Sequence, residues 1–266
     1  MKRLALITGA SSGIGEGYAR TLARQGYDLI IVARRMERLN ALKAELEAQY
    51  GVQVEVLAAD LNEDADITRV EQRIRSVPAL SLLINNAGFD QVGDFAAVPL
   101  ERHLAMLKVH VETMIRLCHA ALPAMRQHHA GAIINVASMG GLSPLPQNSL
   151  YCATKAAMVM FSKVLAGEER RHNIAVQALC PGYTSTEIFD TAGFAGFRAQ
   201  RIPRFLWMSA DAVVQASLRR LRVDQAVIIP GWRNRLFYVL VLLNPFGERI
   251  TRQVWRRLYS DPSPER

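Results

Sequence analysis

The sequence predicts an α/β protein built on a single doubly wound parallel sheet of about seven strands, with helices on both faces. Two observations support this prediction. Short apolar runs, which lack the polar alternation of a half-exposed strand, alternate with longer segments of helical period. The chain has 266 residues, half of them hydrophobic, and no repeat or Pro/Gly-rich linker divides it. We therefore expect one domain over residues 1–231, followed by a C-terminal extension over residues 232–266.

The predicted elements follow one another in alternation. Gly26 ends the first helix, because glycine readily takes the left-handed conformation that closes a helix. The predicted strands are short and apolar, and they cover residues 4–7, 28–33, 53–58, 80–88, 131–138, 174–182 and 226–231. The predicted helices lie between them, at about residues 14–25, up to residue 50, between residues 58 and 80, and at 99–126, 150–171 and 210–222.

The cysteine content, the N-terminal segment and the net charge exclude several classes of protein. Cys118, Cys152 and Cys180 are widely spaced, which argues against a disulfide framework or a zinc site and fits a reducing compartment. The basic start is followed by an apolar run that ends at Thr8, too short for a secretion signal. We therefore expect a cytoplasmic protein without a metal centre. The net charge of +8 suits an anionic partner, but no nucleic-acid-binding motif is present in the sequence.

The segment ITGASSGIGEG joins the first strand to the first helix. Gly9, Gly13 and Gly15 permit a tight turn and a close backbone approach, so that the helix N-terminus can meet a pyrophosphate. The alternative is a glycine-rich turn that binds no ligand. The position between a strand and a helix favours the nucleotide.

The second strand ends in the letters IVARR. A site for NAD would carry an acidic residue there to accept hydrogen bonds from the ribose, whereas here Arg34 and Arg35 follow the strand. A guanidinium group can grip a 2′-phosphate, which favours NADP(H) over NAD(H). The alternative is a solvent-exposed basic start of the next helix.

Tyr151 and Lys155 lie four residues apart in NSLYCATKAAM, so a helix would place them on one face. A lysine cation favours the phenolate and should lower the pKa of the tyrosine. Taken alone, an ordinary helix surface is the simpler explanation of this pair.

Several further motifs, taken together in their order along the chain, favour a catalytic role for Tyr151 and Lys155 over an ordinary helix surface. The motifs, in chain order, are Gly9-x-x-x-Gly13-Ile14-Gly15, Asp60, Asn85-Asn86-Ala87-Gly88, Ser138, Tyr151-x-x-x-Lys155 and Pro181-Gly182. With them the sequence resembles the short-chain dehydrogenase/reductase family over about residues 4–231, and the joint resemblance is far more specific than any single motif.

The resemblance implies a Rossmann fold that binds NAD(P), with Tyr151 as the general acid/base of a ketone–alcohol conversion. Lys155 would lower the pKa of Tyr151 and hold the nicotinamide ribose, and Ser138 would orient the substrate oxygen. Asn85 would steady the central strand, and Thr186 would contact the carboxamide of the nicotinamide. The expected cofactor-binding residues are Gly9, Ser11, Ser12, Gly13, Ile14, Gly15, Arg34, Arg35, Asp60, Leu61, Asn86, Ala87, Gly88, Tyr151, Lys155, Pro181, Gly182, Thr184 and Thr186.

One position departs from the family pattern. The family usually carries a catalytic asparagine in the helix that begins near Pro99, and its backbone carbonyl holds a water of a proton relay. Here His110 takes that place. We expect the backbone role to survive, and the imidazole either joins the relay or only packs.

The expected substrate is a hydrophobic carbonyl compound or alcohol of acyl, steroid-like or polyketide-like character. The segment after the sixth strand is rich in aromatic residues, which either line a pocket or serve as ordinary packing. These aromatic residues are Phe189, Phe194, Phe197, Phe205 and Trp207.

The competing class of function is a non-catalytic NADP(H) sensor or a membrane-peripheral scaffold protein. The family resemblance also favours a homo-oligomer, either a dimer or a tetramer.

The C-terminal extension combines an apolar run, LFYVLVLL, with a basic amphipathic pattern over residues 246–259. The run is too short to span a membrane, which needs about 20 residues. The extension could attach peripherally to an anionic membrane surface, or it could close the pocket or join subunits.

Overall fold

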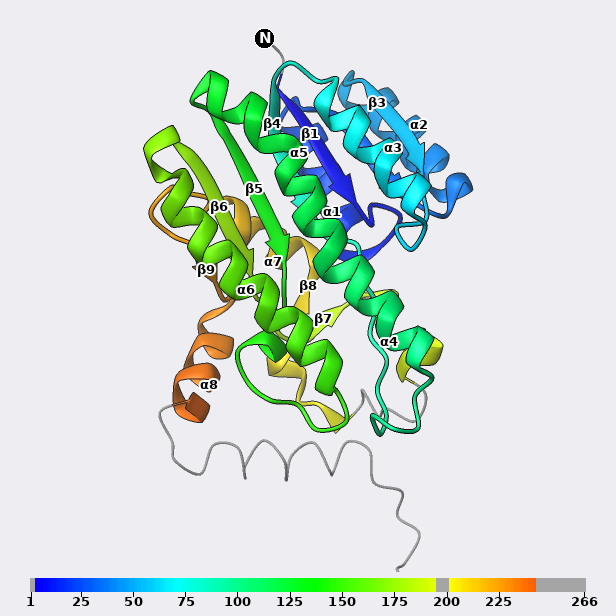
Figure 1. Ribbon diagram of the computed structural model, residues 1–266, viewed down its shortest axis with the longest axis vertical. Coiled ribbons are helices and arrows are strands. Elements are labelled where there is room, and N and C mark those ends of the chain that lie inside the picture. Colours follow the sequence, from blue (N-terminus) through cyan, green and yellow to red (C-terminus); the bar gives the residue numbers. More distant parts are fainter. Residues whose placement is uncertain (1–2, 195–200, 243–266) are drawn as a thin grey trace, which may run out of the picture.

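The computed structural model describes residues 3–194 and 201–242, and its centre is a seven-stranded sheet in the order β3-β2-β1-β4-β5-β6-β9 (Figure 1). All six strand pairs run parallel. The predicted doubly wound sheet is therefore confirmed. The strands are β1 (Leu4–Thr8), β2 (Asp28–Ala33), β3 (Val54–Ala58), β4 (Leu80–Asn85), β5 (Gly131–Val136), β6 (Ile174–Leu179) and β9 (Val227–Ile228).

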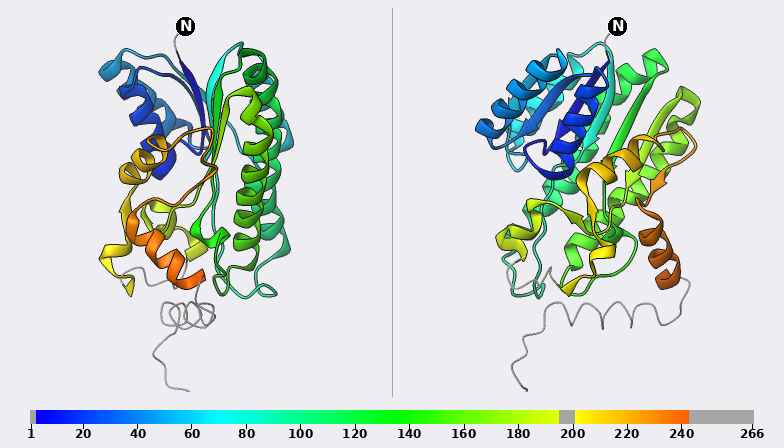
Figure 2. Two further views of the ribbon diagram at one scale, coloured as in Figure 1. Left: turned by 90° about the vertical axis from the view of Figure 1, so that its left-hand side faces the viewer. Right: turned by 180° about the vertical axis from the view of Figure 1, so that it is seen from behind.

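Helices cover both faces of the sheet, as the edge-on view shows (Figure 2). One face carries α3 (Asp64–Arg75), α5 (Thr113–His128) and α6 (Ser149–Glu169). The other face carries α1 (Gly13–Arg24), α2 (Met36–Tyr50) and α7 (Ala210–Leu218). Two apolar cores result, one on each side, because every central strand buries side chains on both of its faces.

The strand order places a crevice at the carboxyl ends of β1 and β4. The chain proceeds from β1 outward to β2 and β3, then returns to β4 on the other side of β1. The connections after β1 and β4 therefore diverge at this point. Ligands of doubly wound sheets bind in such a crevice.

The helix predicted at residues 99–126 is interrupted. It consists of α4 (Leu100–Leu107), a π-helical turn (Lys108–Glu112) and α5. The extra residue of a π turn does not disturb the hydrophobic period enough to be visible in the sequence, and such turns gather at functional sites. His110 lies on this turn.

The region after β6 differs most from the predicted pattern. Short 3₁₀ turns, including η4 (Glu187–Asp190), connect β7 (Thr184–Ser185) to β8 (Met208–Ser209), which form a separate parallel pair. The helix α7 ends at Leu218, four residues before its predicted end. The last strand of the sheet is only two residues long, and the nearby Pro230 has no N–H for a longer ladder.

The C-terminal extension begins with α8 (Trp232–Leu242). The basic pattern predicted over residues 246–259 lies outside the described residues, as does Phe197. Among the described residues, no helix is both long and apolar enough to cross a membrane.

Candidate active site

A cavity of about 720 Å³ opens at the carboxyl ends of the sheet strands. All residues predicted for the site, from the glycine loop to Thr186, line this cavity except Gly15. The volume lies within the range of known cofactor and ligand sites. The fold thus brings together side chains that are up to 177 positions apart, from Gly9 to Thr186.

The glycine positions of the loop leave no room for a Cβ atom. Gly9 and Gly13 have φ angles of 67° and 59°, which only glycine adopts without strain. A Cβ atom on Gly15 would lie 2.3 Å from the carbonyl oxygen of Gly9, so Gly15 supports the loop from beneath and does not face the cavity. The resulting cradle of backbone at the start of α1 fits a dinucleotide pyrophosphate.

The ends of β1 and β4 are clamped to each other beside this loop. The side-chain nitrogen of Asn86 donates to the carbonyl oxygens of Thr8 (3.0 Å) and Gly9 (3.2 Å). The hydroxyl of Thr8 accepts hydrogen bonds from the backbone N–H groups of Asn86 and Ala87. Asn86 therefore fixes the shape of the glycine loop from the neighbouring strand.

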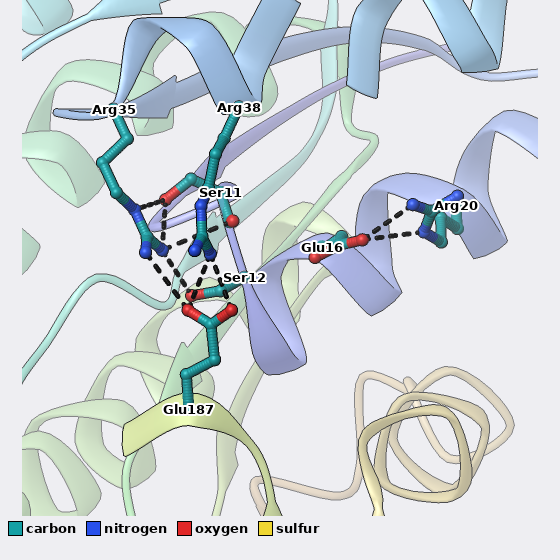
Figure 3. Close-up of polar contacts among 7 residues, drawn as sticks. All are labelled: Ser11, Ser12, Glu16, Arg20, Arg35, Arg38 and Glu187. Carbon is teal, nitrogen blue, oxygen red and sulfur yellow. Dashed lines mark hydrogen bonds and ion pairs between the residues drawn. The ribbon is translucent and has the colours of Figure 1, made fainter. Parts of the chain in front are cut away.

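Arginine side chains converge at the mouth of the cavity (Figure 3). Arg35 donates to the side-chain oxygens of Ser11 (3.0 Å) and Ser12 (2.8 Å) and to the carboxylate of Glu187 (3.1 Å). Arg38 donates to both carboxylate oxygens of Glu187 at 2.7 Å. Arg34 points elsewhere and is 71% exposed, with a loose contact of 3.8 Å to Asp60. The cluster around Arg35 is thus the part of the mouth where guanidinium groups could hold an anion.

Tyr151 and Ser138 both line the inner end of the cavity. Ser138 Oγ accepts a hydrogen bond of 3.0 Å from the N–H of Gly140. The prediction that Lys155 lowers the pKa of Tyr151 is wrong for this arrangement. Desolvation raises the pKa of Tyr151 above its ordinary value, the nearby Asp90 raises it further, and the neighbouring Ser138 hydroxyl acts in the opposite direction.

The position of Lys155 explains this difference. Its amine lies 5.7 Å from the centre of the Tyr151 ring and donates a hydrogen bond of 2.9 Å to the carbonyl oxygen of Val136. Lys155 is buried, and burial lowers its pKa to about 8, although the charges of Asp90 and Cys180 act in the opposite direction. The lysine is therefore held by the end of β5 and not by the phenol.

A chain of buried hydrogen bonds holds α6 against the sheet. The amide of Asn85 donates to Asn135 Oδ1 (2.8 Å), and the amide of Asn135 donates to Ser162 Oγ (2.9 Å). Ser162 in turn donates to the carbonyl oxygen of Met158 (2.7 Å). Because β4, β5 and α6 each contribute a member, the network positions the helix that carries Tyr151 and Lys155.

His110 is buried, with both ring nitrogens in hydrogen bonds. Its Nε2 accepts from the N–H of Phe89 (3.2 Å), so Nδ1 carries the proton and donates to Thr154 Oγ1 (3.0 Å). The Thr154 hydroxyl donates to the carbonyl oxygen of Tyr151 (2.9 Å). Burial, followed by the charge of Lys155, lowers the pKa of His110 well below its usual range. The neutral imidazole therefore connects the π turn to α6, which agrees with the packing role.

Three residues near the cavity were not predicted from the sequence. Asp90 is buried close to Tyr151 and Lys155, and burial raises its pKa to about 7. Arg38 and Glu187 complete the cluster at the mouth. Arg38 could have been found from its position one helical turn after Arg34 and Arg35. No local signal marks Asp90 or Glu187, because their neighbours are distant in the sequence.

The predicted aromatic residues separate into two groups. Phe189 and Phe194 line the cavity and pack on each other, with ring centres 4.9 Å apart. Trp207 packs against Phe189 at 5.0 Å, whereas Phe205 is 59% exposed. Phe189 and Phe194 therefore form an apolar wall of the cavity.

Comparisons with known proteins agree with this geometry. The profile of the family described as short chain dehydrogenase matches residues 3–193. The chain is 32% identical over 189 residues to the very-long-chain 3-oxoacyl-CoA reductase of Anas platyrhynchos, an alignment that covers 69% of this chain and 60% of that reductase.

Two solved structures are similar over most of the chain. One is a short-chain dehydrogenase from Sphingobium yanoikuyae in complex with NADPH, with a TM-score of 0.81, 40% identity, and coverage of 86% of this chain and 88% of that one. The other is the bulky-bulky ketone specific alcohol dehydrogenase from Comamonas testosteroni, with a TM-score of 0.77, 32% identity, and coverage of 91% and 93%.

Proposed function

We propose that this chain, which belongs to the short-chain dehydrogenase family, is an NAD(P)-dependent oxidoreductase that acts on CH–OH and C=O groups. In this proposal it uses NADP(H) to interconvert a hydrophobic ketone and its secondary alcohol. One observation carries this proposal. A single cavity joins an anion-binding cluster at its mouth to Ser138, Tyr151 and Lys155 at its inner end. A non-catalytic sensor would need the first group of residues but not the second.

The residues around the mouth suit NADP(H). β2 ends without a carboxylate, and Arg35 instead directs its guanidinium group toward Ser11 and Ser12 at the start of α1. These donors would hold a 2′-phosphate, while the backbone of the glycine loop would hold the pyrophosphate. The nicotinamide of the bound cofactor supplies or accepts the hydride.

In this proposal Tyr151 supplies the proton. Because desolvation keeps its pKa high, the phenol is protonated at neutral pH and can donate to the carbonyl oxygen of a ketone. Ser138, which lines the same part of the cavity, would hold the same oxygen. Lys155, fixed by the Val136 carbonyl, places a cation beside the site where the phenolate develops.

The apolar wall of Phe189 and Phe194 supports a hydrophobic substrate. The names of two similar proteins point the same way, since one is a very-long-chain 3-oxoacyl-CoA reductase and the other is specific for bulky ketones. A panel of ketones that increase in apolar size, assayed by NADPH oxidation, tests the proposal. Activity should rise with apolar size and should be lower with NADH, and a panel without any turnover would favour the sensor.

The surfaces of α4, α5 and α6 support the proposal of a homo-oligomer. Large apolar side chains stand exposed on these adjacent helices, and burying such a face requires a partner. A second copy of the chain fits, and sedimentation velocity tests this. The exposed residues are Leu100, Leu104, Leu107, Ile115, Met160 and Val164.

We also propose that the C-terminal extension attaches peripherally to a membrane, on the basis of the exposed side chains of α8. Along α8, Trp232, Leu236 and Leu240 are each at least half exposed. Such side chains could enter the headgroup region of an anionic bilayer, aided by the basic residues that follow in the sequence. Flotation with anionic vesicles at low salt should require the residues after Gly231, and a full chain that does not float would exclude attachment.

A further inference from the structure

Glu187 joins the mouth of the cavity to the segment that carries its apolar wall. It is the first residue of η4, and its side chain is 50% exposed. Its carboxylate accepts hydrogen bonds from Arg35 (3.1 Å) and, with both oxygens, from Arg38 (2.7 Å) (Figure 3). An anionic group of the protein thus lies where the two guanidinium groups converge.

The same donors are the ones a phosphate would need. The Arg35 guanidinium is already positioned by Ser11 and Ser12, so it does not depend on Glu187 for its orientation. Carboxylate and phosphate bind guanidinium groups with the same charge-assisted geometry. Two anions cannot share these donors without mutual repulsion, so they compete.

We propose that Glu187 is a specificity-determining residue that competes with the 2′-phosphate of the cofactor for Arg35 and Arg38. A ligand that carries this phosphate displaces the carboxylate, whereas a ligand that lacks it leaves the carboxylate in place. The inference rests on the proposed NADP(H) preference and concerns its regulation. Glu187 lowers the preference below what the arginines alone would produce.

Displacement of Glu187 affects a short, defined part of the chain. On one side, Thr184 is paired with Met208 in the β7–β8 ladder. On the other side, the carbonyl oxygen of Gly193 accepts a hydrogen bond of 2.9 Å from the N–H of Val92. Between these anchors lies η4 with Phe189, which lines the cavity. We expect displacement of the Glu187 side chain by a 2′-phosphate to shift η4 and, with it, the position of Phe189 in the cavity wall.

The test compares the full chain with Glu187→Gln, which keeps the shape of the side chain and removes its charge. The probes are adenosine 2′,5′-bisphosphate and adenosine 5′-monophosphate, measured by calorimetry. The bisphosphate should bind about threefold to tenfold more tightly to Glu187→Gln, the change expected from two partly exposed ion pairs. The monophosphate should bind equally to both proteins, and the difference should shrink at high salt.

A matched control exists in the first turn of α1. Glu16 forms an ion pair of 2.7 Å with Arg20 and makes no contact with Arg35 or Arg38 (Figure 3). Glu16→Gln removes the same charge from the same end of the molecule. Its affinity for the bisphosphate should match that of the unaltered protein, and an equal gain would show a general charge effect and overturn the proposal.

The outcomes separate this inference from the proposed cofactor preference. If the unaltered protein prefers the bisphosphate and Glu187→Gln binds it equally or more weakly, the competition is overturned while the NADP(H) preference stands. If neither protein prefers the bisphosphate over the monophosphate, both proposals fall.

The coupling to the apolar wall has its own readout. Trp207 packs against Phe189 at 5.0 Å, so its fluorescence reports on η4. The bisphosphate should change the tryptophan emission of the unaltered protein, and the monophosphate should not. The change should disappear in Trp207→Phe. An unchanged emission on saturation with the bisphosphate would overturn the coupling.

Discussion

Among the glutamates that pair with arginine, Glu169 and Glu187 have opposite surroundings, since one lies inside the scaffold and the other at the mouth of the cavity. Glu169 on α6 is fully buried and bonds Arg126 of α5 through both of its oxygens. Glu187 is half exposed and is shared by Arg35 and Arg38. A buried carboxylate cannot lose its partner without a large loss of stability, whereas an exposed one exchanges partners easily. Ion pairs of the same chemistry therefore serve a fixed scaffold in one region and an exchangeable contact in the other.

This difference extends to the neighbours of each pair. The inner region contains Lys155, Asp90 and His110, which are buried and hydrogen-bonded, together with Tyr151, which lines the cavity beside them. The mouth contains arginines that water reaches. Substitutions in the inner region should therefore change turnover or folding strongly, and those at the mouth should change only cofactor affinity.

The largest effect is expected from Tyr151→Phe. The ring stays but the proton is lost, so turnover with NADPH and a ketone should fall by about 10²–10⁴-fold while NADPH affinity is retained. The Lys155→Ala protein should lose both turnover and NADPH affinity, since the lysine is proposed to touch the cofactor. Steady-state kinetics and calorimetry measure the two quantities. A Tyr151→Phe protein with ordinary turnover would contradict the assignment of the acid.

The next effect concerns Asp90 and depends on pH. Burial raises its pKa from 3.8 to about 7, so the folded protein binds a proton that the unfolded chain has released between these values. Stability is therefore lost as the pH rises through this window, and the loss is complete above pH 7. Asp90→Asn should raise the free energy of unfolding at pH 8 by up to about 4 kcal/mol, and the gain should vanish toward pH 4.

Urea unfolding across this pH range measures the effect of Asp90→Asn. Asp224→Asn is the control, because Asp224 is 59% exposed and pairs with Arg222 at the surface. It should show no such gain. A gain for Asp90→Asn that is equal at pH 4 and pH 8 would show that burial of the charge is not its cause.

A smaller effect, about 3 kcal/mol of unfolding free energy, is expected from Arg126→Ala, which leaves the Glu169 carboxylate buried and unpaired. The value is at the low end for a broken buried pair because Arg126 is 43% exposed. Arg73→Ala is the matched control, since Arg73 also binds both oxygens of a glutamate, Glu55, whose side chain is 41% exposed. It should cost about 1 kcal/mol or less. Equal losses would abolish the distinction between the two regions.

At the mouth, Arg35→Ala should weaken NADPH binding by about 1.5–3 kcal/mol, the value of hydrogen bonds to a charged group. NADH binding should change little. Arg34→Ala should have a smaller effect, since Arg34 points away from Ser11 and Ser12 and is 71% exposed. Titrations with both cofactors test this, and an equal loss of NADPH and NADH affinity would exclude a 2′-phosphate site.

The smallest effect on turnover is expected from His110→Asn, although this residue lies in the inner region. The substitution removes the imidazole's hydrogen bonds with Thr154 and with the N–H of Phe89, and each such neutral bond is worth about 0.5–1.5 kcal/mol of stability. Turnover should stay within a few-fold, and the pH–rate profile should not shift because the imidazole is already neutral. A shifted profile would show that the imidazole takes part in proton transfer.

Much of the fold follows from patterns within short segments. Apolar runs predicted all seven strands of the sheet, and the glycine spacing predicted the loop between β1 and α1. These features depend on the spacing of hydrophobic residues along the chain and on the backbone conformations that glycine allows. Both are properties of short segments of sequence. The pairing of Tyr151 with Lys155 on one helix follows from the same local geometry.

The sequence by itself therefore determined the sheet, its helices and the residues that gather at the cavity. Only the tertiary structure decided how those residues are charged and which of them share a partner. It raised the pKa of Tyr151 where the sequence predicted a lower one, brought Asp90 beside it, and placed Glu187 between Arg35 and Arg38. The physical reason is that burial and electrostatic contact depend on distances between segments far apart in the chain, which no local pattern contains.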